Sequence, residues 1–173
     1  MEAYVSVITA QVGTHVAVAL LQRAATLAAS FTAPHTRVGG VDLSKVNARL
    51  EKLDVEAKLT CLATLVAAID ENLCSKPVRV ALISLTTSVH EVDESLQLLR
   101  NAVEYHQSRF FSAWRSCDFT EPLLLLDAAT AKMVQRESTL LKMIAIDFSK
   151  LQAPVSGPRP ACTSGLNLAS SDI

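Results

Sequence analysis

The residues best suited to bind another molecule cluster between Tyr105 and Phe119, in the segment YHQSRFFSAWRSCDF. This segment holds five of the chain's eight aromatic side chains, with two arginines between them. Aromatic and arginine side chains are enriched at the centres of protein interfaces. We therefore interpret the segment as a candidate interface, with the contact residues Tyr105, His106, Arg109, Phe111, Trp114 and Arg115. The alternative is that the aromatic side chains cap one end of a helical bundle.

Residue patterns that would indicate an enzyme are missing from the sequence. It contains no GxSxG, HExxH, GxGxxG or phosphate-binding P-loop. The Glu-x-x-His pairs that build a di-metal site inside a helical bundle are also missing. We therefore predict a non-enzymatic protein with no catalytic residues, no metal site and no cofactor.

The four cysteines, at positions 61, 74, 117 and 162, are separated by 13, 43 and 45 residues, which matches no zinc-binding spacing. Cys74 and Cys117 fall near opposite ends of one expected helix, where 43 residues span roughly 60 Å, too far for a disulfide. This favours a reducing intracellular compartment, cytoplasmic or nuclear. Cys61 stands in an apolar run, which predicts a place in the core.

Composition indicates a protein with an aliphatic core and a weak overall electrostatic field. Half of the residues are hydrophobic, 5% are aromatic and 19% are charged, with a formal net charge of −1. That apolar content is too high for a disordered chain. A chain so close to neutral, with two arginines in its aromatic segment, is not expected to bind nucleic acid.

Proline and glycine divide the chain into helices. We predict an all-α fold, an antiparallel four-helix bundle over residues 1–151. Its helices are expected at about 3–30, 43–73, 77–115 and 121–150, with a linker at 31–41 and a disordered tail at 152–173. Pro77 and Pro122 fit the first turns of helices, where the missing N–H costs nothing.

The segment 78–113 has a seven-residue hydrophobic repeat. One series contains Leu82, Val89, Leu96, Val103 and Phe110, and the other contains Val78, Leu85, Val92, Leu99, His106 and Ala113. Such spacing predicts knobs-into-holes packing. Several flanking positions carry small residues, such as Ala81, Ser88 and Ser95, which favours a bundle over an isolated dimer.

Two further helices have apolar stripes of their own. In the second helix the stripe rotates near Asp54, and the uncharged stretch from Thr60 to Ile69 is expected to be covered on several faces. The stripe of the fourth helix comprises Leu123, Leu126, Met133, Leu140, Ile144 and Phe148, with Glu137 at its edge.

His106 occupies a core position of the repeat. One interpretation is a pH-sensitive or partner-specifying polar group in the core. The other is a histidine at a helix end that reaches water.

The N-terminal helix is unusually apolar, with no charged residue from Ala3 to Gln22. Its candidate lipid- or partner-facing residues are Val5, Ile8, Val12, Val16 and Leu20. Its polar residues, among them Gln11 and His15, disfavour a membrane span. A helix of this kind packs into its own bundle, against a partner or onto a membrane surface.

Together these patterns predict a scaffold or adaptor, a structural subunit of a larger protein assembly. Its expected partners are other protein subunits or a second copy of itself. The alternative is a membrane-active four-helix domain at the membrane periphery, whose N-terminal helix engages lipid.

Overall fold

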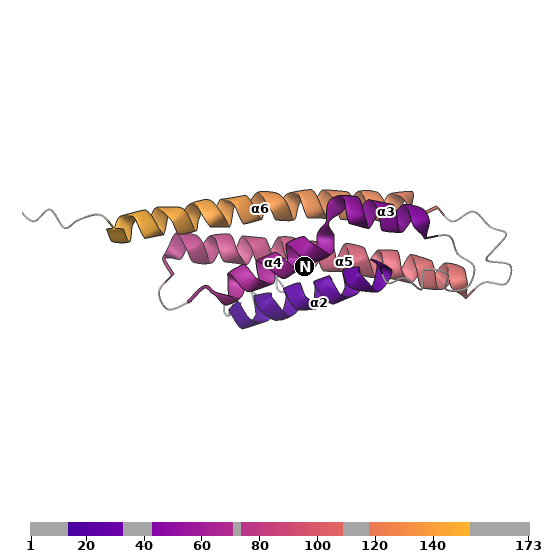
Figure 1. Cartoon of the computed structure of the whole chain (residues 1–173), viewed down its shortest axis with the longest axis horizontal. Helices are drawn as coiled ribbons and strands as arrows, with labels where there is room; N and C mark the ends of the chain where they lie inside the picture. The colour runs from indigo at the N-terminus through magenta and orange to yellow at the C-terminus, as the bar shows by residue number, and fades with distance from the viewer. Residues whose placement is uncertain (1–13, 33–42, 71–73, 109–117, 153–173) are drawn as a thin grey trace, which may run out of the picture.

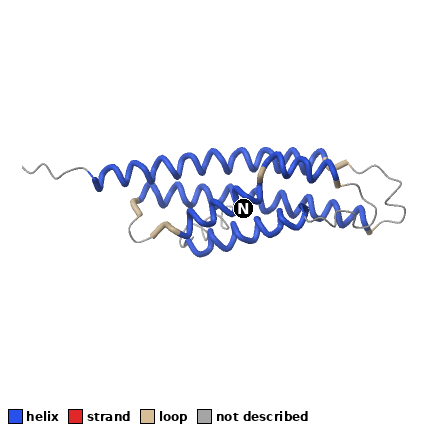
Figure 2. The backbone as a smooth tube through the Cα atoms, viewed as in Figure 1, coloured by secondary structure: helices blue, strands red, loops and turns tan. Residues whose placement is uncertain are grey.

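The structure is a computed structural model that describes residues 14–32, 43–70, 74–108 and 118–152. All regular secondary structure in these ranges is helical (Figure 2). The helices are α2 (Thr14–Thr32), α3 (Ser44–Leu53), α4 (Val55–Ala67), α5 (Lys76–Gln107) and α6 (Thr120–Gln152). The first thirteen residues, residues 33–42 of the linker region and the C-terminal tail from residue 153 lie outside the described ranges, whereas Phe31 and Thr32, expected in the linker, end α2.

The helices pack together around one hydrophobic core. Figure 1 shows α5 and α6 side by side along most of their length, with α2 and α4 on the other side of α5 and α3 beside the first part of α6. Because the two short helices α3 and α4 follow one another along the length of the bundle, they count together as one of the four helical units that surround the core. The fold is therefore all-α, as the sequence predicts.

The helix expected over 43–73 is instead two helices, because the backbone leaves the right-handed region at Asp54. This residue has φ 52° and ψ 43°, in the left-handed region, where aspartate is tolerated better than most residues. Its N–H still donates to Leu50 and Glu51, and its carbonyl accepts from Lys58. The break gives the two helices different neighbours. Helix α3 contacts α6 as well as α2, whereas α4 packs on α2.

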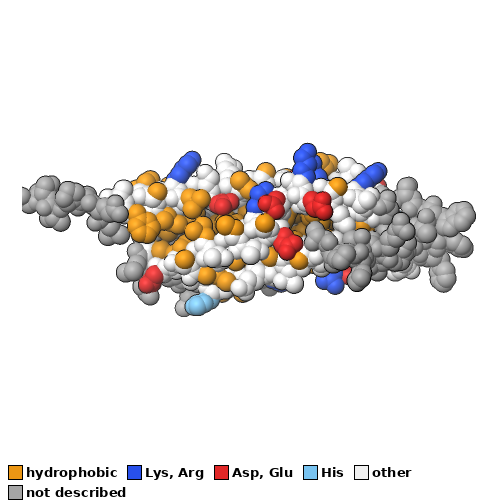
Figure 3. Space-filling model, viewed as in Figure 1, with side chains coloured by type: hydrophobic (Ala, Val, Ile, Leu, Met, Phe, Trp, Pro, Cys, Tyr) orange, Lys and Arg blue, Asp and Glu red, His pale blue; other side chains and the backbone are white. Residues whose placement is uncertain are grey.

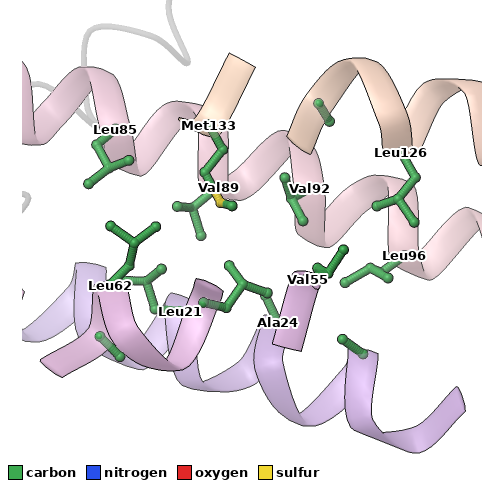
Figure 4. Packing of buried hydrophobic residues seen from close by; sticks show 14 of the residues in the cluster. Leu21, Ala24, Val55, Leu62, Leu85, Val89, Val92, Leu96, Leu126 and Met133 are labelled. Atoms are coloured by element: carbon green, nitrogen blue, oxygen red, sulfur yellow. The ribbon is translucent and has the colours of Figure 1, made fainter. Parts of the chain in front are cut away.

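The core side of α5 carries large aliphatic side chains in three- and four-residue steps. Its eight apolar repeat positions from Val78 to Val103 are all at most 7% exposed. The small flanking residues Ala81, Ser88 and Ser95 are buried too. Figure 4 shows Leu85, Val89, Val92 and Leu96 of α5 converging with side chains from α2, α4 and α6.

The buried face of α2 consists largely of small residues. Its buried residues are Thr14, Ala17, Leu21, Ala24, Ala28 and Phe31, again in three- and four-residue steps. Val16, one of the candidate lipid- or partner-facing residues, is 56% exposed, and Leu20, another of them, is half-buried. Alanine has no side-chain bulk beyond Cβ, so an alanine face lets α2 lie close to both α4 and α5.

Two expectations for α4 are also wrong. Cys61 is exposed rather than part of the core. The uncharged stretch from Thr60 to Ile69 is covered on one face only, because Thr60, Thr64 and Ala67 are exposed. These residues are small or polar, so solvent can cover them without exposing large apolar groups.

On α6, Leu126, Met133 and Leu140 are fully buried, whereas Phe148 is 61% exposed. Phe148 therefore does not belong to the core stripe to which the sequence assigned it. The groove between Lys76 of α5 and Met143 of α6 shows that α6 passes the start of α5 near this point. Beyond it α6 continues without α5 beside it (Figure 1).

Candidate functional site

The aromatic segment is described only at its edges. Tyr105 is 59% exposed near the end of α5, and His106 is half-buried. The Nδ1 atom of His106 is buried and has no hydrogen-bond partner. Arg109, Phe111, Trp114 and Arg115 lie outside the described residues. Phe119 is 8% exposed and belongs to the hydrophobic core.

The N-terminal candidates are likewise described only in part. Val5, Ile8 and Val12 precede the first described residue. Val16 lies in the first turn of α2 with its side chain largely exposed. Within the described ranges no helix is long and apolar enough to cross a membrane.

A buried carboxylate joins α2 to α5. Asp93 is 1% exposed, and its Oδ2 atom lies 3.1 Å from Nη2 of Arg23 on α2. The same oxygen accepts a hydrogen bond of 2.6 Å from Nε2 of Gln97, one turn further along α5. Oδ1 is buried without a partner. The sequence places Asp93 beside the core repeat, but it gives no sign that an arginine from α2 reaches it.

An open cavity of about 570 Å³ lies next to this carboxylate, between α2 and α5. Its lining comprises Arg23, Thr26, Leu27, Ser30, Gln97, Arg100, Asn101 and Glu104. Both side chains that hold Asp93 belong to this lining, and Arg100 is paired with Glu104 at 2.7 Å. The charged side chains of this lining are thus paired, Arg100 with Glu104 and Arg23 with Asp93. Among the described residues no group of three or more His, Cys, Asp or Glu side chains could hold a metal ion.

Two ion pairs attach α6 to the other helices. Arg49 of α3 donates to Asp127 from both Nε, at 2.9 Å, and Nη2. This hydrogen bonding raises the pKa of Arg49. Lys132 of α6 is paired with Glu91 of α5. The first pair fixes α3 against one side of α6 near its beginning.

The same side of α6 is uncovered further along. Steps of seven residues from Asp127 reach Val134, Leu141 and Phe148, which are 39%, 44% and 61% exposed. Seven residues are nearly two helical turns, so these side chains follow one line along the helix. Together with the exposed small residues Ala131, Ser138 and Ala145 they form what we call the outer stripe of α6.

A shallow groove of about 480 Å³ runs along the outer stripe, lined by Val134, Glu137, Ser138, Leu141, Lys142 and Ala145. Figure 3 shows hydrophobic side chains gathered on the left half of the molecule, where α6 continues past α3. The sequence contains this stripe as a second large-and-small pattern on the fourth helix. The core stripe expected from the sequence includes Phe148, whereas Val134 and Leu141 belong to no expected stripe.

Comparison with known proteins adds little to this geometry. No protein-family model matches the chain. No solved structure matches it either. An uncharacterised protein of Acanthamoeba polyphaga mimivirus is 26% identical over 74 residues, which are 43% of this chain and 36% of that protein. The match thus spans about a third of the relative's length.

Proposed function

We propose that this chain is a non-enzymatic scaffold or adaptor, a helical bundle that binds other protein subunits through the outer stripe of α6. One observation supports the proposal above all. Of the ten large hydrophobic side chains that are exposed among the described residues, six lie on α6, and three of these, Val134, Leu141 and Phe148, form one line in the outer stripe. Apolar groups concentrated on one element of a surface are typical of protein-binding sites.

The proposed architecture is an antiparallel four-helix bundle whose core is packed by the heptad positions of α5. A bundle of this kind holds its longest helix rigid, and the 33 residues of α6 extend about 50 Å. The ion pairs Arg49–Asp127 and Lys132–Glu91 fix its rotation, so that Val134 and Leu141 stay directed outward. A rigid helix loses little entropy when its exposed face docks.

Affinity purification of the tagged chain from its native source tests this function. The wild-type chain should retain another protein in fixed stoichiometry, and Leu141→Glu should release it. Leu98→Glu is the matched control, because Leu98 is 51% exposed on α5 and lies away from the outer stripe. Loss of the complex with both variants, or with neither, would argue against the outer stripe as the binding face.

A second candidate function is the engagement of lipid by the N-terminal helix. The exposed position of Val16 favours it, because the described helices leave this candidate lipid-facing side chain uncovered. Flotation with liposomes of neutral and anionic lipids is the direct test. The wild-type chain should float and Val16→Asp should float less, whereas a chain that stays at the bottom of the gradient contradicts this function.

A further inference from the structure

The beginning of α6 is already covered by a helix on the side of the outer stripe. Figure 1 shows α3 beside the first part of α6, with both helices running in the same direction. Val46 and Leu50 of α3 are buried in the core, and Arg49 beside them is paired with Asp127 of α6. The element that fits against this side of α6 is thus a short amphipathic helix with a basic residue at one edge.

Beyond α3 the same place beside α6 is open. Arg49 lies level with Asp127, so Leu53, the last residue of α3, lies level with about Ala131, because both helices rise equally per residue. The break at Asp54 then directs α4 towards α2. Among the described helices only α5 packs along the part of α6 that follows. The opening therefore begins where α3 ends.

The part of α6 that faces this opening is more apolar than the part that α3 covers. Val134, Leu141 and Phe148 follow Asp127 by one, two and three heptads, and all three are exposed. From Val134 to Phe148 the line is about 21 Å long, which is the length of a helix of two heptads. A second short helix therefore fits on the same line after α3.

The two charged residues of the groove lie on opposite sides of this apolar line. Glu137 and Lys142 are five positions apart, which separates them by about 140° around the helix axis. A helix that lies on the line has a carboxylate beside one edge and an ammonium group beside the other. A basic residue at the first edge can pair with Glu137 as Arg49 pairs with Asp127.

We propose that the outer stripe of α6 binds an amphipathic helix of a partner protein, about two heptads long, in the place beside α6 that α3 leaves at Leu53. The apolar face of this helix covers Val134, Leu141 and Phe148. One edge carries a basic residue near Glu137, and the other carries an acidic residue near Lys142. This inference rests on the proposed function, since it states the chemistry of the partner that the outer stripe binds.

A synthetic peptide of two heptads, added to the full chain, tests the proposal. This mixed peptide has leucine at the first and fourth positions of each heptad, lysine along one edge and glutamate along the other. A helix this short is marginal in water, so binding should increase its helicity in circular dichroism difference spectra. Fluorescence anisotropy of the labelled peptide should give a Kd on the order of 10 μM. A scrambled peptide of the same composition, without an apolar face, should not bind.

Substitutions on the protein locate the contact. Leu141→Glu should raise the Kd of the mixed peptide more than about tenfold, because it places a charge within the apolar contact. Leu98→Glu, the exposed control on α5, should leave the Kd unchanged. Circular dichroism melting of each variant verifies that the fold persists.

A charge reversal tests the two edges. In Glu137→Lys both edges of the groove are positive, so a peptide with glutamate along both edges should bind about threefold more tightly than the mixed peptide. The wild type should prefer the mixed peptide by a similar factor. This reversal distinguishes a helix seated between Glu137 and Lys142 from apolar adhesion elsewhere on the surface.

The proposal fails if the wild type does not bind the mixed peptide or binds the scrambled one equally well. It also fails if Leu141→Glu has no effect or if Glu137→Lys does not reverse the preference. Suppose that no peptide binds, yet Leu141→Glu disrupts a native complex. The partner then presents something other than a helix, and the proposed function stands. Peptide binding without such a complex would instead remove the proposed function and leave the helix site.

Discussion

Arg23 of α2 reaches the buried carboxylate of Asp93 on α5, with 3.1 Å between Nη2 and Oδ2. The arginine side chain is 63% exposed, whereas the aspartate is 1% exposed. The guanidinium thus lies at the surface and neutralises a charge that lies beneath it. The packing of α2 on α5 depends on this contact as well as on the alanine face.

Removal of that arginine should destabilise the fold. In Arg23→Ala the Asp93 carboxylate keeps only Gln97 as a partner, and a buried polar group left this way costs about 1–3 kcal/mol. Urea unfolding followed by circular dichroism measures the cost. The double variant Arg23→Ala/Asp93→Leu should regain part of the loss, since the buried charge is gone. A neutral Arg23→Ala would show that water or another group already stabilises Asp93.

The left-handed conformation of Asp54 predicts which substitutions this position tolerates. Asp54→Ala should lower the free energy of unfolding by about 1 kcal/mol, because alanine adopts the left-handed region less readily than aspartate. Asp54→Gly should be tolerated, since glycine has no Cβ to clash. The control is Glu51→Ala, an exposed position three residues earlier within α3. Equal effects of the two alanine substitutions would contradict a left-handed Asp54.

The contact between α3 and α6 should show measurable coupling. Arg49→Gln and Asp127→Asn are each expected to lower the melting temperature, and the double substitution should cost less than their sum. The pair Arg100–Glu104 serves as the control, because both side chains are more than half exposed on one helix. Thermal melts at low and high salt check the result, and the coupling of Arg49 with Asp127 should weaken as salt rises.

The beginning of α6 predicts a dependence on pH. An Oδ1 atom of Asp118 accepts the backbone N–H of Thr120 at 2.9 Å, and hydrogen bonds from Thr120 lower the pKa of Asp118. A carboxyl whose pKa is lower in the folded state stabilises the fold above its ordinary value of about 3.9 and loses this effect as the pH falls through the folded value. Asp118→Ala should therefore reduce the melting temperature at neutral pH.

The pH dependence of the effect of Asp118→Ala shows whether the charge of Asp118 causes it. The difference between the wild type and Asp118→Ala should shrink as the pH drops below about 4, where the carboxyl takes up its proton. The control substitution is Glu51→Gln, at an exposed carboxyl of α3. A difference that stays constant with pH would mean that the substitution acts through helix propensity rather than through the charge.

The core of α5 could be predicted from sequence because its positions carry Leu and Val at every step, and such residues are buried wherever a partner exists. The face of α2 could not be predicted in this way. Hydropathy favours Val16 over Ala17, yet the close approach of three helices selects the smaller side chain. Where helices pack tightly, the more hydrophobic of two neighbouring residues is therefore not always the buried one.

Two other features could not be predicted from the sequence, because they depend on backbone conformation and on neighbouring helices. The rotation of the stripe near Asp54 was visible in the sequence, but an aspartate inside a charged helix gives no sign of a left-handed conformation. The exposure of Phe148 follows from where α5 begins, which is a property of the assembled fold and not of the fourth helix itself. Of the candidate contact residues after His106, the structure describes none.

The break at Asp54 lets one stretch of chain reach two sides of the bundle. Before the break α3 is tied to α6 by Arg49 and also contacts α2, and after it α4 packs on α2. Since Val46 and Leu50 of α3 are buried in the shared core, we expect a load applied to α6 to reach α2 through α3.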